Sequence, residues 1–202
     1  KNKVKKQLKP IVFIFVIGLW ILTGCNSNKQ NDAVYDTLTD RYGNEITRPQ
    51  KIERIISTAP SNTEILTALG LGSHLIAVDQ YSQYIEGVNS DIEYLELTNP
   101  DAETIINLKP DLIITSGINS TENTENSYSV FEEAGISVVD VPTSQSIEDI
   151  YADIAFIAEL TGTVEEGNTV IENMQEQIND IAAVGKTIDT PKTIYFEIGS
   201  TP

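Results

Sequence analysis

Short apolar runs alternate with helical patterns between residues 54 and 162, and this alternation constrains the fold more than any other feature. The runs are RIIST (54–58), LIAVD (75–79), DLIITSG (111–117) and SVVDVP (137–142). Short, almost wholly apolar runs are typical of strands that are buried on both faces of a sheet. The segments between them are long enough for helical crossovers, which predicts βαβ units and a mostly parallel sheet. We therefore expect an α/β fold with three layers.

Two helix starts carry the spacing of a capping box. Ser61 and Glu64 have this spacing after the first apolar run, which predicts that Ser61 caps the following helix. Thr163 and Glu166 repeat it at the start of a long amphipathic helix that we expect at residues 163–184.

The patterns divide the chain into five parts. We expect a signal peptide at 1–24, a flexible tether at 25–34, an N-terminal α/β lobe at 35–162, a linking helix at 163–185 and the start of a second lobe at 186–202. Residues 34–50 alternate on both sides of a Tyr-Gly-Asn turn, which predicts a β-hairpin. A strand predicted at 192–198 has nothing after it to complete a sheet. We therefore expect the second lobe to be largely missing and the chain to be cut short.

The N-terminal segment has the three parts of an export signal. A basic start is followed by an apolar run at 11–22 and by two small residues. Twelve residues rise only about 18 Å as a helix, which is too short for a permanent span of the hydrocarbon core. The sequence Leu22-Thr23-Gly24-Cys25 resembles the lipobox of bacterial lipoproteins, which implies that Cys25 carries lipid and becomes the mature N-terminus. The alternative is an ordinary secretory signal with an incidental cysteine.

Charge and composition exclude several classes of function. The net charge is −17, and five of the 13 basic residues precede Cys25, so the remaining chain is still more acidic and disfavours nucleic acid. The single histidine, His74, cannot build a site for free zinc, so we expect no metal site. Ser57, His74 and Asp79 supply the residue types of a hydrolytic triad, but no GxSxG or GxxxxGK[ST] motif is present. We expect neither an enzyme nor a cofactor.

The ends of two predicted strands are candidates for ligand binding. In an open α/β sheet, ligands bind beyond the carboxyl ends of the strands. This rule nominates Thr58, Ala59, Pro60, Ser61 and Asn62 in one loop, and Ser116, Gly117, Ile118 and Asn119 in another. The alternative for each residue is an ordinary structural role in its loop.

Several motifs in combination resemble a known family. RIISTAPSNTEILTALGLG, NPDAETIINLKPDLIITS, FEEAGISVVDV and KTIYFEIG are similar to segments of the substrate-binding lipoproteins of ABC importers for cobalamin, haem and ferric siderophores. The resemblance covers nearly everything after residue 34. It implies two α/β lobes joined by one rigid helix, here at 163–185, with the ligand in the cleft between the lobes.

The resemblance also implies roles for individual residues. Glu103 matches a glutamate that docks onto an arginine of the permease, while its alternative role is to stabilise the first turn of a helix. Tyr81 matches a tyrosine that packs against the flat ring system of the ligand, and Tyr84 is a second candidate. Leu97 stands where the cobalamin binder has a tryptophan, so the match does not select cobalamin. For Glu64, we prefer a capping role to docking.

Together these features predict a monomeric receptor, anchored by lipid on the extracytoplasmic face of the cell membrane. It would capture an iron complex, such as a ferric siderophore or haem, or cobalamin, and deliver it to an ABC permease and its ATPase. Two alternatives remain. One is a surface sensor or adhesin lipoprotein that uses the same fold without transport, and the other is an envelope enzyme.

Overall fold

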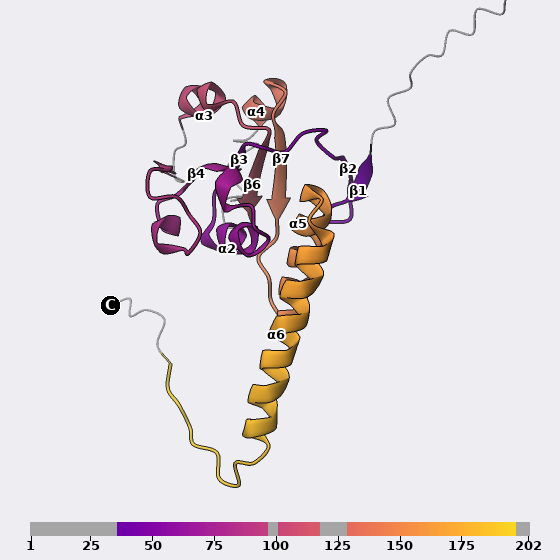
Figure 1. Ribbon diagram of the computed structural model, residues 1–202, viewed down its shortest axis with the longest axis vertical. Helices are drawn as coiled ribbons and strands as arrows, with labels where there is room; N and C mark the ends of the chain where they lie inside the picture. Colours follow the sequence, from indigo (N-terminus) through magenta and orange to yellow (C-terminus); the bar gives the residue numbers. More distant parts are fainter. Residues whose placement is uncertain (1–35, 97–100, 118–128, 197–202) are drawn as a thin grey trace, which may run out of the picture. The chain divides into compact units, whose positions relative to one another are not determined.

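The computed structural model describes residues 36–96, 101–117 and 129–196 (Figure 1). Its strands are β1 (Thr37–Thr39), β2 (Glu45–Thr47), β3 (Ile55–Ser57), β4 (Leu75–Asp79), β5 (Glu93–Leu95), β6 (Leu112–Ser116) and β7 (Ser137–Val141). Its helices are α2 (Pro60–Ala68), α3 (Ala102–Leu108), α4 (Ser129–Glu133), α5 (Ile147–Thr161) and α6 (Val164–Gly185), with the short 3₁₀ helices η1 (Gly72–His74) and η2 (Ser82–Tyr84). Strands β3 to β7 form one parallel sheet in the order β5-β4-β3-β6-β7. The α/β prediction is confirmed.

Helices cover both faces of this sheet. Ile55 of β3 and Ile114 of β6 belong to an apolar cluster that includes side chains from α2 and α5. The adjacent Ile56 and Ile113 belong to a second cluster, which includes side chains from α3 and α4. Successive side chains of a strand point to opposite faces, so a strand covered on both faces has no polar side. This is why β3, β4 and β6 each begin with a run of apolar residues, and it gives the three predicted layers.

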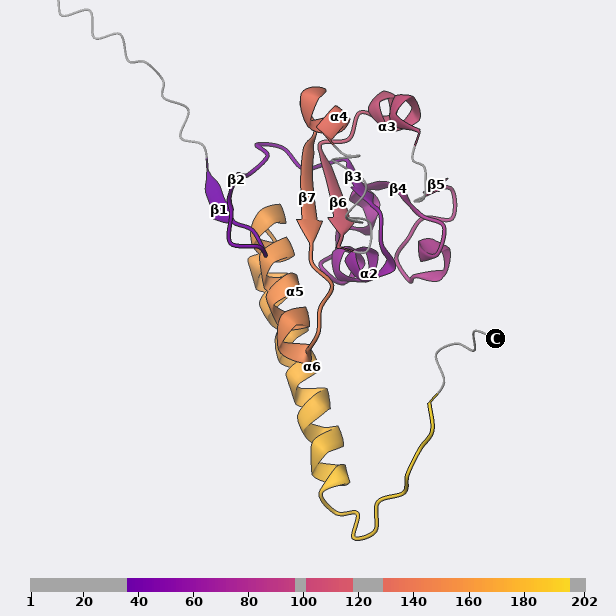
Figure 2. The ribbon, with the colours of Figure 1, turned by 180° about the vertical axis from the view of Figure 1, so that it is seen from behind.

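Later strands are added on both sides of the central strand β3. It first adds β4 and β5 on one side, and then crosses to the other side of β3 to add β6 and β7 (Figures 1 and 2). Because β4 and β6 lie on opposite sides of β3, the direction in which strands are added reverses between β3 and β6. Open α/β sheets bind ligands at such a point.

Strand β5 was not predicted. It lies at one edge of the sheet, and only Leu95 of its three residues is buried. An edge strand with two exposed side chains carries too weak an apolar signal to be recognised, so its pairing with β4 decides its structure.

The predicted hairpin, formed by β1 and β2, is present and is held to the lobe by its turn. Arg41 Nε donates to Oδ1 of Asp153 in α5 at 2.5 Å. The Tyr42 hydroxyl donates to Oδ2 of Asp140 in β7, also at 2.5 Å. Burial and this hydrogen bond to Asp140 raise the pKa of Tyr42 to about 12.

The predicted capping box at Ser61 and Glu64 is wrong. Ala59 is the N-cap residue of α2, and no side chain caps this helix. Pro60 occupies the first helical position, where its fixed φ suits the helix and its missing N–H costs nothing. Helix α2 therefore starts before Ser61, whose side chain is exposed.

Other helix starts differ from the prediction in a similar way. Thr163 is the N-cap residue of α6, but its side chain makes no cap bond and instead pairs with the Thr161 hydroxyl at 2.9 Å. Helix α5 has a reciprocal cap that was not predicted. Ser146 Oγ accepts from the Asp149 N–H at 3.1 Å and donates to the Asp149 carboxylate at 3.0 Å. Hydrogen bonds from the Gln145 N–H and from Ser146 lower the pKa of Asp149.

The predicted long helix is present as α6 and begins by packing on α5. A Cβ atom at Gly167 would lie only 2.5 Å from the Ala158 Cβ, so the two helices come close at this glycine. From residue 179 onward the side chains of α6 are exposed. None of the described helices is both long and apolar enough to cross a membrane.

The strand predicted at 192–198 is not formed in its described part. Residues 192–196 have no regular secondary structure, and residues 197 and 198 lie outside the described residues. A strand needs a neighbour for its backbone hydrogen bonds. No described strand pairs with this segment.

Candidate ligand-binding site at the carboxyl edge of the sheet

The two nominated loops come together at the carboxyl ends of β3 and β6. The Thr58 N–H donates to the Ile114 carbonyl at 3.0 Å. The Asn62 Nδ2 group, at the start of α2, donates to the Thr115 carbonyl at 2.8 Å. These bonds join the start of α2 to the end of β6, so the predicted site residues share one edge of the sheet.

Four of the nominated residues are buried at this edge. They are Thr58, Ala59, Asn62 and Ser116. The hydrogen bonds of Thr58 and Asn62 run to backbone carbonyls of β6, so both side chains hold the two loops together. Direct contact of these residues with a ligand stays a prediction.

The other predicted residues present more of their surface. Ser61 is exposed, while Pro60 and Gly117 are half-buried. A Cβ atom at Gly117 would lie 3.2 Å from the Thr143 backbone nitrogen, so the loops after β6 and β7 also approach each other. Ile118 and Asn119 lie outside the described residues, as does Cys25 with the whole predicted signal and tether.

Two tyrosines stand out from the end of β4. Tyr81 caps η2 and is 69 % exposed, and Tyr84 ends η2 and is 88 % exposed. Between them, Ser82 is fully buried. Exposed aromatic rings on a short, hydrogen-bonded loop suit a flat, partly apolar ligand, because each ring buries a large area and loses little side-chain freedom.

The Tyr81 loop is fastened by residues that the sequence analysis missed. The Tyr81 N–H donates to Asp79 Oδ1 at 2.8 Å, and the Ser82 hydroxyl donates to Asp79 Oδ2. Asp79 was considered only as a possible member of a triad. The sequence pattern that could have indicated this role is an Asp at the end of a predicted strand with a Ser three residues later.

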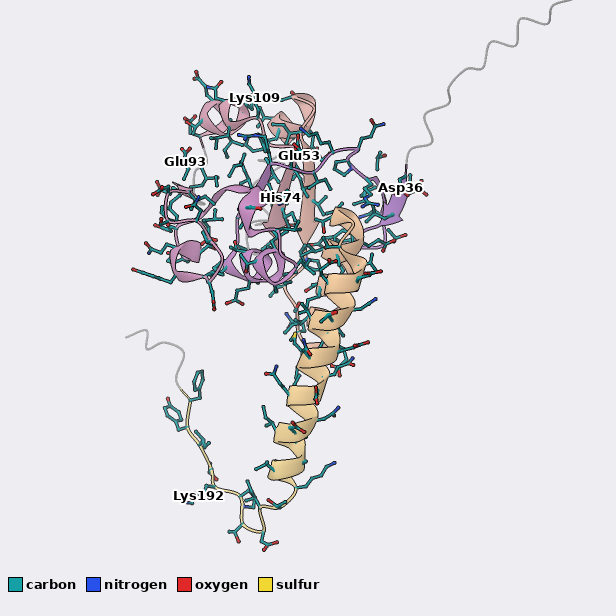
Figure 3. The ribbon with its side chains drawn as sticks, in the orientation of Figure 1. Asp36, Glu53, His74, Glu93, Lys109 and Lys192 are labelled. Atoms are coloured by element: carbon teal, nitrogen blue, oxygen red, sulfur yellow. The ribbon has the colours of Figure 1, made fainter. Side chains whose placement is uncertain are left out.

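The residues of the possible triad are not assembled. His74 lies directly before β4 (Figure 3), and Asp79 is the last residue of this strand. The strand alone spans about 13 Å from Leu75 to Asp79, so the two side chains are far apart. The Ser57 hydroxyl donates to the Ala59 carbonyl, and the His74 ring contacts Ser73 Oγ at 3.5 Å. Within the described ranges, no group of three or more His, Cys, Asp or Glu side chains could hold a metal ion.

Glu103 lies in the first turn of α3 and is exposed. The N-cap residue Asp101 accepts a hydrogen bond from the Glu103 N–H at 3.2 Å, and the hydroxyl of Thr104 holds the pKa of Asp101 below its usual value. The Glu103 carboxylate itself makes no ion pair with another described residue. It is therefore available both to the helix dipole and to a partner.

A parallel α/β lobe with exposed aromatic side chains at the carboxyl edge of its sheet is typical of a ligand-binding protein. The chain belongs to the periplasmic binding protein family, whose sequence model matches residues 55–200. The resemblance inferred from the motifs is thus confirmed.

Individual relatives support this assignment. The chain is 30 % identical, over 92 % of its length, to an uncharacterized ABC transporter substrate-binding lipoprotein of Bacillus subtilis. It is 32 % identical, over 75 % of its length, to a vitamin B12-binding protein of Vibrio vulnificus. The alignments cover 64 % and 54 % of these two proteins, so the chain spans little more than half the length of the second.

A solved structure shares the fold. It is that of a possible iron-binding, periplasmic solute-binding protein from Staphylococcus epidermidis, with a TM-score of 0.63 and 27 % sequence identity. The similarity covers 71 % of this chain and 54 % of the other.

Proposed function

We propose that this chain is the substrate-binding component of an ABC importer that captures an iron complex, such as a ferric siderophore or haem, or cobalamin. The observation that carries the proposal is the pair of exposed rings, Tyr81 and Tyr84, beside the switch point of a periplasmic binding protein lobe. Relatives that are described as vitamin B12-binding and iron-binding support this ligand class.

The ligand would rest on the carboxyl edge of the sheet. In our proposal, Tyr81 and Tyr84 contact its flat face, while the backbone and side chains of residues 58–62 and 116–119 contact its polar groups. A second lobe beyond the linking helix, as the family resemblance implies, would close the site from the other side. Exposed rings lose water on such a contact, which supplies most of the binding free energy.

Membrane anchoring and delivery complete the proposal. Lipid on Cys25 would anchor the protein on the extracytoplasmic face of the membrane. Two acyl chains anchor a protein durably, whereas a single chain binds reversibly. Glu103 would dock on a basic residue of the permease. The strongly acidic chain would speed the encounter with such a basic partner.

A binding panel tests the ligand class. Full-length protein is titrated with haem, cobalamin and several ferric siderophores, and quenching of tyrosine fluorescence is followed. We expect one ligand to bind, and Tyr81→Ala or Tyr84→Ala to weaken its affinity about tenfold. Tyr94→Ala is the matched control, because Tyr94 is an exposed tyrosine of β5 that does not belong to the loop carrying Tyr81 and Tyr84. If none of these ligands binds, the proposed substrate class is wrong.

A transport assay separates the importer from its main alternative. Uptake of the bound ligand should require the protein together with the permease. A sensor or adhesin would bind the ligand equally well without supporting uptake.

A further inference from the structure

Four polar side chains lie fully buried at the carboxyl edge, and two of them hold the loop that carries the two tyrosines. They are Ser57 of β3, Thr63 of α2, Asp79 of β4 and Ser82 of η2, each with 0 % of its surface exposed. Thr63 Oγ1 donates to Ser57 Oγ at 2.8 Å and lies 3.1 Å from Ser82 Oγ. The Ser82 hydroxyl in turn donates to the Asp79 carboxylate. Hydrogen bonds thus join Ser57 to Thr63 and Ser82 to Asp79, and the two pairs meet at the contact between the Thr63 and Ser82 hydroxyls.

Asp79 is an unusual group to bury in this way. Moving a carboxylate out of water is costly unless it is well paired or hydrogen-bonded. The ion pairs among the described residues do not include Asp79. Its hydrogen bonds come from the Tyr81 N–H and the Ser82 hydroxyl, both in the loop that carries the exposed rings.

We propose that Asp79 and Ser82 are positioning residues that hold the Tyr81 and Tyr84 rings in a fixed, outward-facing arrangement for the ligand. This inference rests on the proposed function and assigns a new role within the same site. Buried Ser82 lies between the two exposed tyrosines, so fixing its hydroxyl fixes the backbone on both sides of it.

The benefit to binding is preorganisation. A loop that already has its bound conformation loses less freedom when the ligand arrives. If the loop adopts that conformation for only a fraction of the time, the apparent affinity falls by the same fraction. Asp79 and Ser82 therefore act on the affinity through the tyrosines, without touching the ligand.

The test uses Ser82→Ala in the full-length protein, because Asp79→Ala removes two buried bonds at once and endangers folding. We expect Ser82→Ala to weaken binding of the panel ligand about tenfold, the loss expected for one hydrogen bond to a charged group. Ser144→Ala is the matched control, since Ser144 also donates a hydroxyl to a buried carboxylate, that of Asp153. It should lower the melting temperature without weakening binding.

A double-mutant cycle separates positioning from general structural damage. In a Tyr81→Ala/Tyr84→Ala background, Ser82→Ala should cause no further loss of affinity, because the rings through which it acts are absent. An equal loss in both backgrounds would overturn the inference.

Amide hydrogen exchange tests the loop without any ligand. Ser82→Ala should speed exchange of the Tyr81 amide about tenfold, because its acceptor Asp79 is no longer held. Unchanged exchange would refute the positioning role. If the wild-type protein binds no panel ligand, the proposed function fails separately, and the exchange rate still decides whether Asp79 and Ser82 fix the loop.

Discussion

Replacing Arg41 is the substitution whose effect on stability follows most directly from the structure. Its guanidinium lies 2.5 Å from the Asp153 carboxylate and fastens the β1–β2 hairpin to α5. The Asp153 side chain is 6 % exposed and that of Arg41 is 20 % exposed. Arg41→Met keeps much of the volume but leaves the Asp153 charge with one described donor, the Ser144 hydroxyl.

The expected cost follows from the unequal burial of the partners. Removing one partner of a buried ion pair costs about 3–5 kcal/mol, because the other charge stays behind without compensation. Asp153→Asn should cost only about 1–2 kcal/mol, since Arg41 is partly exposed and can be hydrated. For a chain of this size, the loss from Arg41→Met corresponds to a fall in Tm of roughly 6–20 °C.

Urea unfolding followed by circular dichroism measures both losses. Asp36→Asn is the control, because its ion pair with Arg48 is largely exposed, and it should cost less than about 1 kcal/mol. The reasoning would be refuted if Arg41→Met cost no more than this control. It would also be refuted if Asp153→Asn were the more destabilising of the two changes.

Three further results are expected. Gly72→Ala should destabilise the fold by about 1–3 kcal/mol in the urea assay, since the new Cβ atom would lie 2.3 Å from the Gly87 carbonyl oxygen. An unchanged unfolding midpoint would contradict this close contact. The Tyr42 phenol should ionise near pH 12 when ultraviolet absorbance is followed. The stability that its hydrogen bond to Asp140 contributes should be fully present below pH 10 and be lost as the pH rises through about 12. A phenol that titrates near pH 10 would argue against the bond. Glu103→Arg should impair uptake but leave ligand affinity intact, and a loss of affinity would exclude the docking role.

The sheet was largely predictable because its strands are covered on both faces. Burial on both sides makes β3, β4 and β6 mostly apolar, and the edge strand β7 still carries three valines, so these patterns are visible without a structure. β5 was missed because an edge strand needs only one buried side chain, here Leu95. The strand expected at 192–198 has a suitable composition, but the described residues provide no strand to pair with it.

Helix ends were less predictable than helix positions. Several residues near a helix start can serve as its cap, and the choice depends on where the preceding strand delivers the chain. The sequence favoured Ser61 as the N-cap residue of α2, but in the structure the N-cap residue is Ala59, two residues earlier. It also gives α5 a reciprocal cap between Ser146 and Asp149 that spacing alone had not singled out.

The sequence by itself determined the class of the fold, its family and the loops where a ligand is expected. These depend on local periodicity and on motifs that are continuous along the chain. Only the tertiary structure decided which residues of those loops are buried supports and which are exposed surfaces. Thr63 and Ser82 are 19 positions apart, yet their hydroxyls lie 3.1 Å from each other because β3 and β4 are adjacent strands. Burial and hydrogen bonding depend on such distant neighbours, so the role of Asp79 appeared only once the sheet was assembled.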